Sequence, residues 1–211
     1  MRLSKIGILA LSFLLFSTGV SAQLIGKKKN ETEMETDGKA EFDKGVQEAR
    51  ETARKKLVPY KYDGTKSTYF SYKSYTYAKE VEVVTLEKTD YKICFNSNMV
   101  TADKIGVKIY DKPQDGKGRI LLYEKEDIGG NEFEVNLEDL NETFKTKKKE
   151  MWPKEKHDLV DKMRLKRLYV NYIIPAVERE METVEDDYGN QKKTTVIQYS
   201  AIVLAVGYLN L

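Results

Sequence analysis

The stretch that decides the fold runs from Asp90 to Leu140 and contains Tyr91-Lys-Ile93-Cys-Phe95, Ile105-Gly-Val107-Lys-Ile109, Ile120-Leu-Leu122-Tyr123 and Phe133-Glu-Val135-Asn-Leu137. Each of these segments places large apolar residues at every second position. A pleated strand turns alternate side chains to one face, so each segment predicts a strand with one buried side. Polar turns such as Gly129-Gly130-Asn131 separate the segments and favour antiparallel pairing.

Two strong strands are predicted at the end of the chain. They are Leu168 to Ile174 and Val196 to Leu211, joined by an acidic hairpin through Asp186-Asp187. The last run is apolar on both faces between Ile202 and Val206, which is typical of a strand in the middle of a sheet. The sequence therefore predicts a mainly β domain over residues 59–211, an antiparallel, jelly-roll-like β-sandwich of about eight strands.

An amphipathic helix is predicted before the sandwich, over residues 41–58. Its apolar residues recur at spacings of three and four and are Phe42, Val46, Ala49, Ala53 and Leu57. Pro59 ends the pattern. Because the apolar stripe is thin, we expect the helix to lie on the outside of a sheet or to pair with a partner.

The first 22 residues have the composition of a secretory signal peptide. A basic start is followed by an apolar run from Ile6 to Phe16 and by small residues up to Ala22. The apolar run is shorter than the ~20 residues that a membrane-spanning helix needs. Residues 23–40 are polar and predict a disordered tether. We therefore expect an exported protein, in the periplasm or at the cell surface.

The exported chain is neutral overall. Arg2 and Lys5 lie in the signal segment, so of 36 basic side chains 34 remain, against 34 acidic ones. This balance removes any whole-molecule argument for nucleic-acid binding. Cys94 is the single cysteine, which excludes an internal disulfide. Since it stands between Ile93 and Phe95, we expect it to face the opposite side of its strand as a small apolar residue.

A basic insertion interrupts the strand pattern at residues 144–167. Between Thr143 and Arg167 ten basic side chains, among them Lys147, Lys148 and Lys149, accompany four acidic ones. The sequence predicts a long charged loop with a short helix near 158–165. One interpretation is a solvated loop. The other is a docking element for an acidic partner, an anionic glycan or a lipid surface, with Trp152 as its anchor.

The segment 60–77 is rich in tyrosine and predicts two strands or an extended arm, with a turn at Asp63-Gly64. Its tyrosines can simply pack on a sheet edge. Alternatively Tyr69, Tyr72 and Tyr75 form an aromatic surface for sugars or a partner, because tyrosine combines a flat apolar ring with a polar tip. Spacing alone does not choose between these interpretations.

The sequence offers no assembled catalytic constellation, so we assign no catalytic and no metal-binding residues. His157 is the single histidine, and its charged neighbours favour a solvated side chain over a general base or metal ligand. Acids such as Asp90, Asp103, Asp111 and Asp115 fall at turns, where acids are common. A Ca²⁺ site built from such carboxylates stays an open alternative that no motif supports.

The order of the strands resembles the small jelly-roll sandwiches called pre-peptidase C-terminal domains, accessory modules of secreted bacterial proteins. The segments that carry the resemblance are Val84-Thr-Leu86, Asp90-Tyr91-Lys-Ile93, Ile105 to Asp111, Phe133-Glu-Val135 and Leu168-Tyr169-Val170. They cover about half of the exported chain. The sequence departs from the family at Arg167, where the family has a glycine. The resemblance implies a binding or stabilising module without catalytic residues.

These features predict a non-enzymatic interaction or structural module of the bacterial cell envelope, whose partner is another envelope protein or a glycan. Nucleic acid is not expected, and membrane contact is at most peripheral. One alternative is a carbohydrate-binding module that uses exposed Tyr and Trp side chains. A second is an acid-dependent hydrolase such as a glycosidase. A third is a small outer-membrane β-barrel, although the strands lack a continuous lipid-facing band.

Overall fold

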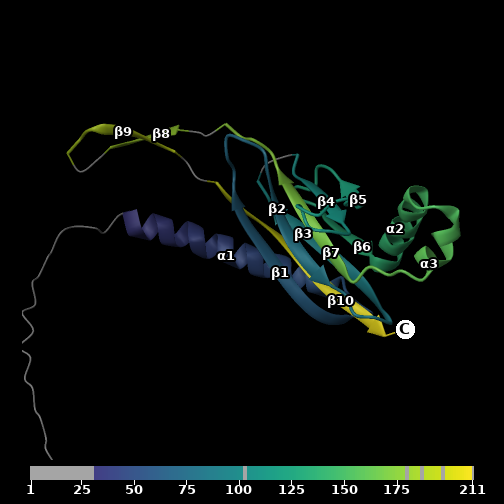
Figure 1. Cartoon of the computed structure of the whole chain (residues 1–211). Helices are drawn as coiled ribbons and strands as arrows, with labels where there is room; N and C mark the ends of the chain where they lie inside the picture. The colour runs from purple at the N-terminus through teal and green to yellow at the C-terminus, as the bar shows by residue number, and fades with distance from the viewer. Residues whose placement is uncertain (1–30, 102–103, 179–180, 186–187, 196–197, 211) are drawn as a thin grey trace, which may run out of the picture.

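Eight strands form two four-stranded antiparallel sheets in the computed structural model of the chain (Figure 1). The structure describes residues 31–101, 104–178, 181–185, 188–195 and 198–210. The first sheet has the order β1 (Lys61–Ser71), β10 (Tyr199–Asn210), β3 (Thr89–Met99) and β6 (Glu132–Asn136). The second has the order β2 (Tyr77–Val84), β7 (Arg167–Ile174), β4 (Gly106–Tyr110) and β5 (Leu121–Lys125).

The topology is that of a jelly roll. The chain changes sheet at almost every connection, and among the described strands of the sandwich only β4 and β5 pair with their neighbour in sequence. The predicted mainly β sandwich is therefore confirmed. The prediction for the final strand is also confirmed, because β10 lies between β1 and β3.

The core lies between the two sheets and takes its side chains from alternate positions of the strands. Ile93 and Phe95 of β3 face Val170 and Tyr172 of β7, and all four are fully buried. The Phe95 ring stacks on Phe133 with 4.6 Å between the ring centroids. This alternation is the period-two pattern that the sequence shows between Asp90 and Leu140.

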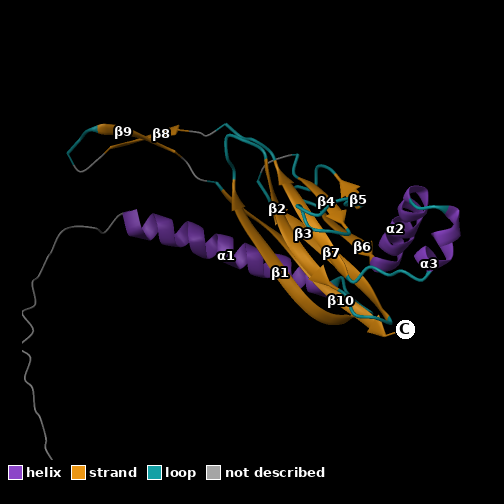
Figure 2. Cartoon of the chain, in the orientation of Figure 1, coloured by secondary structure: helices purple, strands orange, loops and turns teal. Residues whose placement is uncertain are grey.

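Helix α1 (Glu31–Lys55) covers the outer face of the first sheet (Figure 2). Val46, Ala49, Ala53 and Leu57 pack against small side chains of that face, which are Cys94, Ala201, Val203 and Ala205. The predicted position of the helix and the outward orientation of Cys94 are confirmed. The predicted bounds were wrong, because residues 31–40 are helical and the helix ends at Lys55.

The outer face of the second sheet is covered instead by ion pairs. Lys108 pairs with Glu124 at 2.5 Å, Arg119 with Glu80 at 2.9 Å and Arg167 with Glu82 at 2.8 Å. Surface pairs of this kind contribute about 0–1 kcal/mol each. They keep this face polar rather than holding the fold together.

Lysine side chains cap the free edges of the sandwich. The ammonium of Lys66 on β1 donates to the Glu82 carbonyl on β2, and that of Lys79 on β2 donates to the Tyr69 carbonyl on β1. On the opposite edge, Lys147 donates to the Leu121 carbonyl of β5 at 2.7 Å. Lysine on an edge strand opposes pairing with a further strand.

Three predictions about local structure were wrong. Asp63-Gly64 is not a turn but a register shift within β1. Leu137 does not continue β6 but begins helix α2 (Leu137–Met151), whose first turn carries Glu138 and Asp139. The charged insertion at 144–167 is not a long loop but continues α2 and adds η1 (Lys154–Lys156) and α3 (His157–Asp161). Residues 162–166 lead from α3 into β7 outside any helix.

The strands β8 (Met181–Glu185) and β9 (Gln191–Thr195) form a separate two-stranded sheet, as the hairpin prediction required. Asp186 and Asp187, the expected turn residues, lie outside the described residues. Figure 1 shows this ribbon at the end of the molecule opposite α2 and α3. Within the described residues, none of the helices is long and apolar enough to cross a membrane.

Candidate functional site

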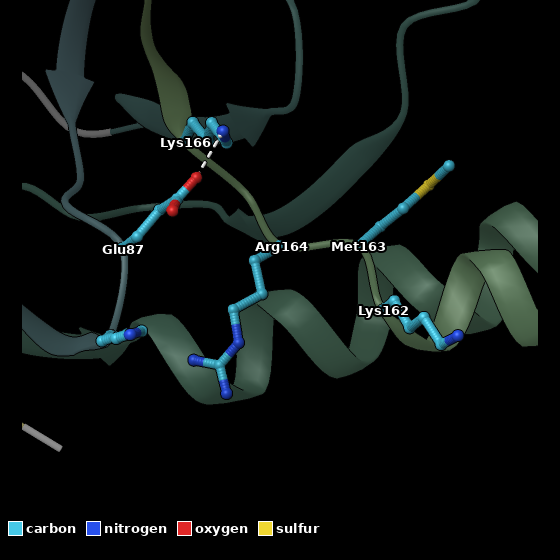
Figure 3. Close-up of a pocket in the computed structure, with 6 residues that line it drawn as sticks. Glu87, Lys162, Met163, Arg164 and Lys166 are labelled. Carbon is cyan, nitrogen blue, oxygen red and sulfur yellow. Dashed lines mark ion pairs between the residues drawn. The ribbon is translucent and has the colours of Figure 1, made fainter.

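A cavity of about 620 Å³ opens at the end of the sandwich where β2 turns into β3 and the chain enters β7 (Figure 3). We call it the basic pocket. It is lined by Glu87 and Lys88 from the β2–β3 turn and by Lys162, Met163, Arg164 and Lys166 from the segment before β7. Four of these six side chains are cationic and one is acidic.

Buried hydrogen bonds hold the 162–166 segment in place. The Leu165 N–H donates to the Asn141 Oδ1 of α2 at 2.8 Å, and the Thr85 hydroxyl donates to the Leu165 carbonyl at 2.7 Å. The Thr85 N–H also donates to the Lys166 carbonyl at 3.0 Å. Asn141, Thr85 and Leu165 are all buried. This wall of the pocket is therefore fixed to both α2 and the end of β2.

The β2–β3 turn, which forms the other wall, is also fixed by side chains. The Leu86 N–H donates to the Tyr91 hydroxyl at 3.2 Å, and the Thr89 hydroxyl donates to the Leu86 carbonyl at 2.5 Å. Lys88 has a φ of 59°, which is uncommon for a residue with a side chain. The tight turn projects Leu86 to the surface, where 65% of the residue is exposed.

The pocket carries an excess of positive charge. Glu87 and Lys166 form an ion pair at 2.5 Å, and Figure 3 shows the two side chains facing each other with Arg164 directed away from them. The hydrogen bond and charge of Lys166 lower the pKa of Glu87. Lys88, Lys162 and Arg164 make no ion pair with another described residue. Three cations are thus left to attract an anion.

A smaller cavity of about 130 Å³ adjoins the basic pocket and has mixed charge. Arg164 lines both cavities, and in the smaller one it lies with Lys145 among the acids Asp90, Glu138 and Glu142. The acids limit the positive field on the side of α2. We therefore expect an anion to enter from the side of Lys88 and Lys162.

The fold exposes two of the three tyrosines predicted to bind a ligand and buries the third. Tyr72 is buried, with its hydroxyl 3.1 Å from Ser200 Oγ, so it cannot stack on a ligand. Tyr69 contacts Phe42 of α1, with 6.3 Å between the ring centroids. Tyr75 is 57% exposed and lies beside Tyr77 and under the ammonium of Lys73. The prediction of Tyr72 as a binding residue is therefore wrong, whereas Tyr69 and Tyr75 are exposed and stay predicted binding residues.

The predicted residues of the charged insertion lie on or beside α2, and each lysine already makes its own contact within the chain. Lys148 lies over the Trp152 ring with 5.0 Å between Nζ and the centroid. Lys149 pairs with Asp161 at 2.6 Å, and Lys147 caps the edge of β5. Trp152 is half-buried at the end of α2. Successive lysines point in different directions because residues on a helix are 100° apart.

The two side chains with the most reactive groups, His157 and Cys94, make structural contacts. His157 Nε2 lies 3.1 Å from the Lys149 carbonyl and 3.3 Å from the Trp152 carbonyl, so it serves as a donor at the end of α2. The prediction of a solvated His157 was wrong, because the ring is half-buried there. Cys94 is buried under α1, and this burial raises its thiol pKa to about 11, so little thiolate forms at neutral pH.

The carboxylates for which a Ca²⁺ site was an open alternative include Asp90 and Asp111, which accept hydrogen bonds within the fold. Asp90 accepts from the Tyr60 hydroxyl at 2.7 Å, and Asp111 accepts from the Ile120 N–H at 2.6 Å. Asp103 lies outside the described residues. Within the described part of the chain, no three His, Cys, Asp or Glu side chains come together as metal ligands would.

Sequence reasoning missed most of the basic pocket. One signal was present, since cations alternate at Lys162, Arg164 and Lys166 just before a strong strand. Lys88 gave no such signal. It reaches the site only because Val84 of β2 pairs with Arg167 of β7, which brings together positions 83 residues apart in sequence.

No family model and no curated protein matches the chain. The resemblance to pre-peptidase C-terminal domains therefore stays a prediction. Among solved structures, the chain is similar to a structure of infectious bursal disease virus, Gx strain, with 11% sequence identity and a TM-score of 0.22. The match covers 71% of this chain and 34% of the viral chain. The chain thus spans about a third of that protein's length, and a likeness at this score supports no conclusion.

Proposed function

We propose that the protein is an exported, non-enzymatic interaction module of the bacterial cell envelope, and that its basic pocket binds an acidic partner. The observation that carries this proposal is the excess of cations on two rigid walls, with Lys88, Lys162 and Arg164 outside any ion pair among the described residues. The signal-like segment 1–22 supports export to the periplasm or the cell surface.

Rigid walls favour recognition because a partner does not have to order them. Immobilising a flexible side chain at an interface costs roughly 0.5–1.5 kcal/mol. The backbone of the 162–166 segment is already held by Asn141 and Thr85. The long basic side chains are then the main groups that lose freedom on binding.

Charge alone gives limited affinity. Each exposed ion pair contributes about 0.2–1 kcal/mol, so three or four of them contribute about 1–4 kcal/mol. A micromolar complex needs about 8 kcal/mol. The partner must therefore add apolar contacts, for which Met163 in the pocket and the exposed Leu86 beside it are suited. This favours an acidic protein segment with apolar or aromatic residues over a simple anion.

The contacts that His157 and Cys94 make within the fold support a non-enzymatic role. His157 faces two backbone carbonyls, and the thiol of Cys94 is packed against the helix α1. Neither residue lines the basic pocket. A catalytic use of either residue would require the surrounding contacts to break.

Binding to poly-L-glutamate tests the proposal. The labelled polymer is titrated with the protein at low ionic strength, and its fluorescence anisotropy is followed. Lys162→Glu together with Arg164→Glu should weaken binding at least about tenfold. Lys44→Glu with Arg50→Glu makes the same charge change on the exposed side of α1 and should have little effect. Equal weakening by the two double variants, with unchanged melting temperatures, would contradict the proposal.

A further inference from the structure

Residues 144–161 form a helical cap beside the two sheets, made of the second half of α2, η1 and α3 (Figure 2). The apolar side of α2 packs on the core through Leu137, Leu140 and Phe144, which are all buried. The same side of the helix continues to Met151, seven residues after Phe144, yet 59% of Met151 is exposed. The apolar side of α2 therefore extends beyond the part that the core covers.

Contacts between α2 and α3 hold the helical cap in shape. Lys149 of α2 pairs with Asp161 of α3 at 2.6 Å, and His157 Nε2 lies 3.3 Å from the Trp152 carbonyl. Leu159 lies in α3, and 55% of it is exposed. Because the two helices are fixed to each other, this leucine is displayed on the same rigid unit as the exposed end of α2.

Basic side chains accompany the exposed apolar groups of the helical cap. Residues 144–167 hold ten basic side chains against four acidic ones. The Lys148 Nζ lies 5.0 Å and the Lys156 Nζ 5.7 Å from the centroid of the Trp152 ring. Lys148, Lys154 and Lys156 make no ion pair with another described residue. Cations around an indole, next to exposed apolar side chains, are typical of surfaces that bind an anionic bilayer.

From this composition and geometry we infer that the helical cap docks the protein on the surface of an anionic lipid bilayer. Met151, Trp152 and Leu159 lie at the level of the headgroups, and the unpaired lysines face the lipid phosphates. Each lysine near such a surface strengthens binding by about fivefold, so three of them contribute about a hundredfold. This role goes beyond the proposed function, because none of the three apolar and aromatic residues lines the basic pocket.

A bilayer fits the helical cap better than a second copy or an acidic protein does. Two copies joined through their caps bring two basic surfaces together, which is repulsive. An acidic protein segment finds fixed walls in the basic pocket, which Met151 and Leu159 do not line. Binding to a lipid surface needs no such walls, because its strength follows from the apolar area buried and from the attraction between cations and anionic lipids.

Fluorescence of the full-length protein with lipid vesicles tests the inference, because Trp152 is the single tryptophan and its emission reports on the helical cap. Equimolar vesicles of phosphatidylglycerol and phosphatidylcholine should shift the emission to shorter wavelength, and brominated acyl chains should quench it. Vesicles of phosphatidylcholine alone should need at least about tenfold more lipid for half of the shift. Addition of 0.5 M NaCl should reverse the shift, since the Debye length is then only a few ångströms.

Two variants separate the contribution of the charges from that of the apolar groups. Lys148→Gln with Lys154→Gln and Lys156→Gln should raise the lipid concentration at half of the shift at least about tenfold. Met151→Ser with Leu159→Ser should raise it at least about fivefold, because less apolar area is buried. Both apolar positions are exposed, so the melting temperature should stay near that of the wild type.

The control Lys39→Gln with Lys44→Gln and Arg50→Gln removes three cations from exposed positions of α1 and should leave the half-shift concentration within about twofold. The inference is overturned if the phosphatidylglycerol vesicles cause no shift at low salt, if both kinds of vesicle shift the emission equally, or if the control weakens binding as much as the lysine variant. A shift caused by glycerol phosphate in solution, or by raising the protein concentration without lipid, would assign the cap to a free anion or to a second copy and overturn it too.

Discussion

The two ends of the sandwich are built in different ways. At the pocket end, buried side chains hold the backbone in place, as Asn141 and Thr85 hold Leu165. At the opposite end, the chain leaves β7 for a two-stranded ribbon that pairs with neither four-stranded sheet. An isolated two-stranded hairpin is only marginally stable in water. The comparison indicates a preformed pocket at one end and, at the other, a ribbon whose two strands pair only with each other.

Removing the hydrogen bond between Asn141 and Leu165 at the pocket end should have the largest effect on stability. Asn141→Ala leaves the buried Leu165 N–H without its acceptor, which costs about 1–3 kcal/mol of folding stability. Urea unfolding measures this loss. Binding of poly-L-glutamate should weaken as well, because one wall of the pocket loses its support. A variant with native stability and native affinity would show that the hydrogen bond from Leu165 to Asn141 of α2 does not shape the pocket.

A substitution in the core between the two ends should stabilise the protein rather than destabilise it. The Tyr172 hydroxyl is fully buried and finds no hydrogen-bond partner among the described residues, and this burial raises its pKa. Tyr172→Phe removes the unsatisfied group and should stabilise the protein by about 1 kcal/mol. Poly-L-glutamate affinity should not change. Destabilisation would mean that the hydroxyl has a partner, such as a buried water.

The smallest expected effect is on stability at alkaline pH. It comes from the hydrogen bond between Tyr60 and Asp90. The hydrogen bond from the Tyr60 hydroxyl to the Asp90 carboxylate raises the Tyr60 pKa from 10.0 to about 12. The folded protein holds this proton more tightly than the unfolded chain, so stability is retained below pH 10 and lost as the pH rises towards 12. Tyr60→Phe should make the decline between these pH values shallower. Identical pH profiles for both proteins would contradict this role of the bond.

The sequence was sufficient to predict the layers of the fold. Period-two alternation identified β3, β4 and β5, and the apolar run from Ile202 to Val206 predicted the central position of β10. Alternation gave a wrong prediction at Leu137. This residue continues the apolar alternation of Phe133 and Val135 in β6, but it is the first residue of α2. The phase of a strand and the first turn of a helix coincide over one residue, so a local pattern cannot separate them.

The candidate site was much harder to predict. The lysines at 147–149 drew attention as a run, yet a helix distributes them to an edge carbonyl, an aromatic pair and Asp161. The cations that do converge come from a turn and from a segment far away in sequence. Their meeting depends on the register between β2 and β7, a non-local property that composition and spacing do not contain.

Chemical-shift mapping tests the central claim most directly. The ¹⁵N-labelled protein is titrated with poly-L-glutamate, and the backbone amide shifts are followed by NMR. Our account predicts the largest changes at residues 86–88 and 162–166, around Lys88 and Arg164, with little change at Tyr75 or along α1. Largest shifts at Tyr75 or Trp152, or uniform small shifts over the surface, would contradict the assignment of the basic end as the binding site.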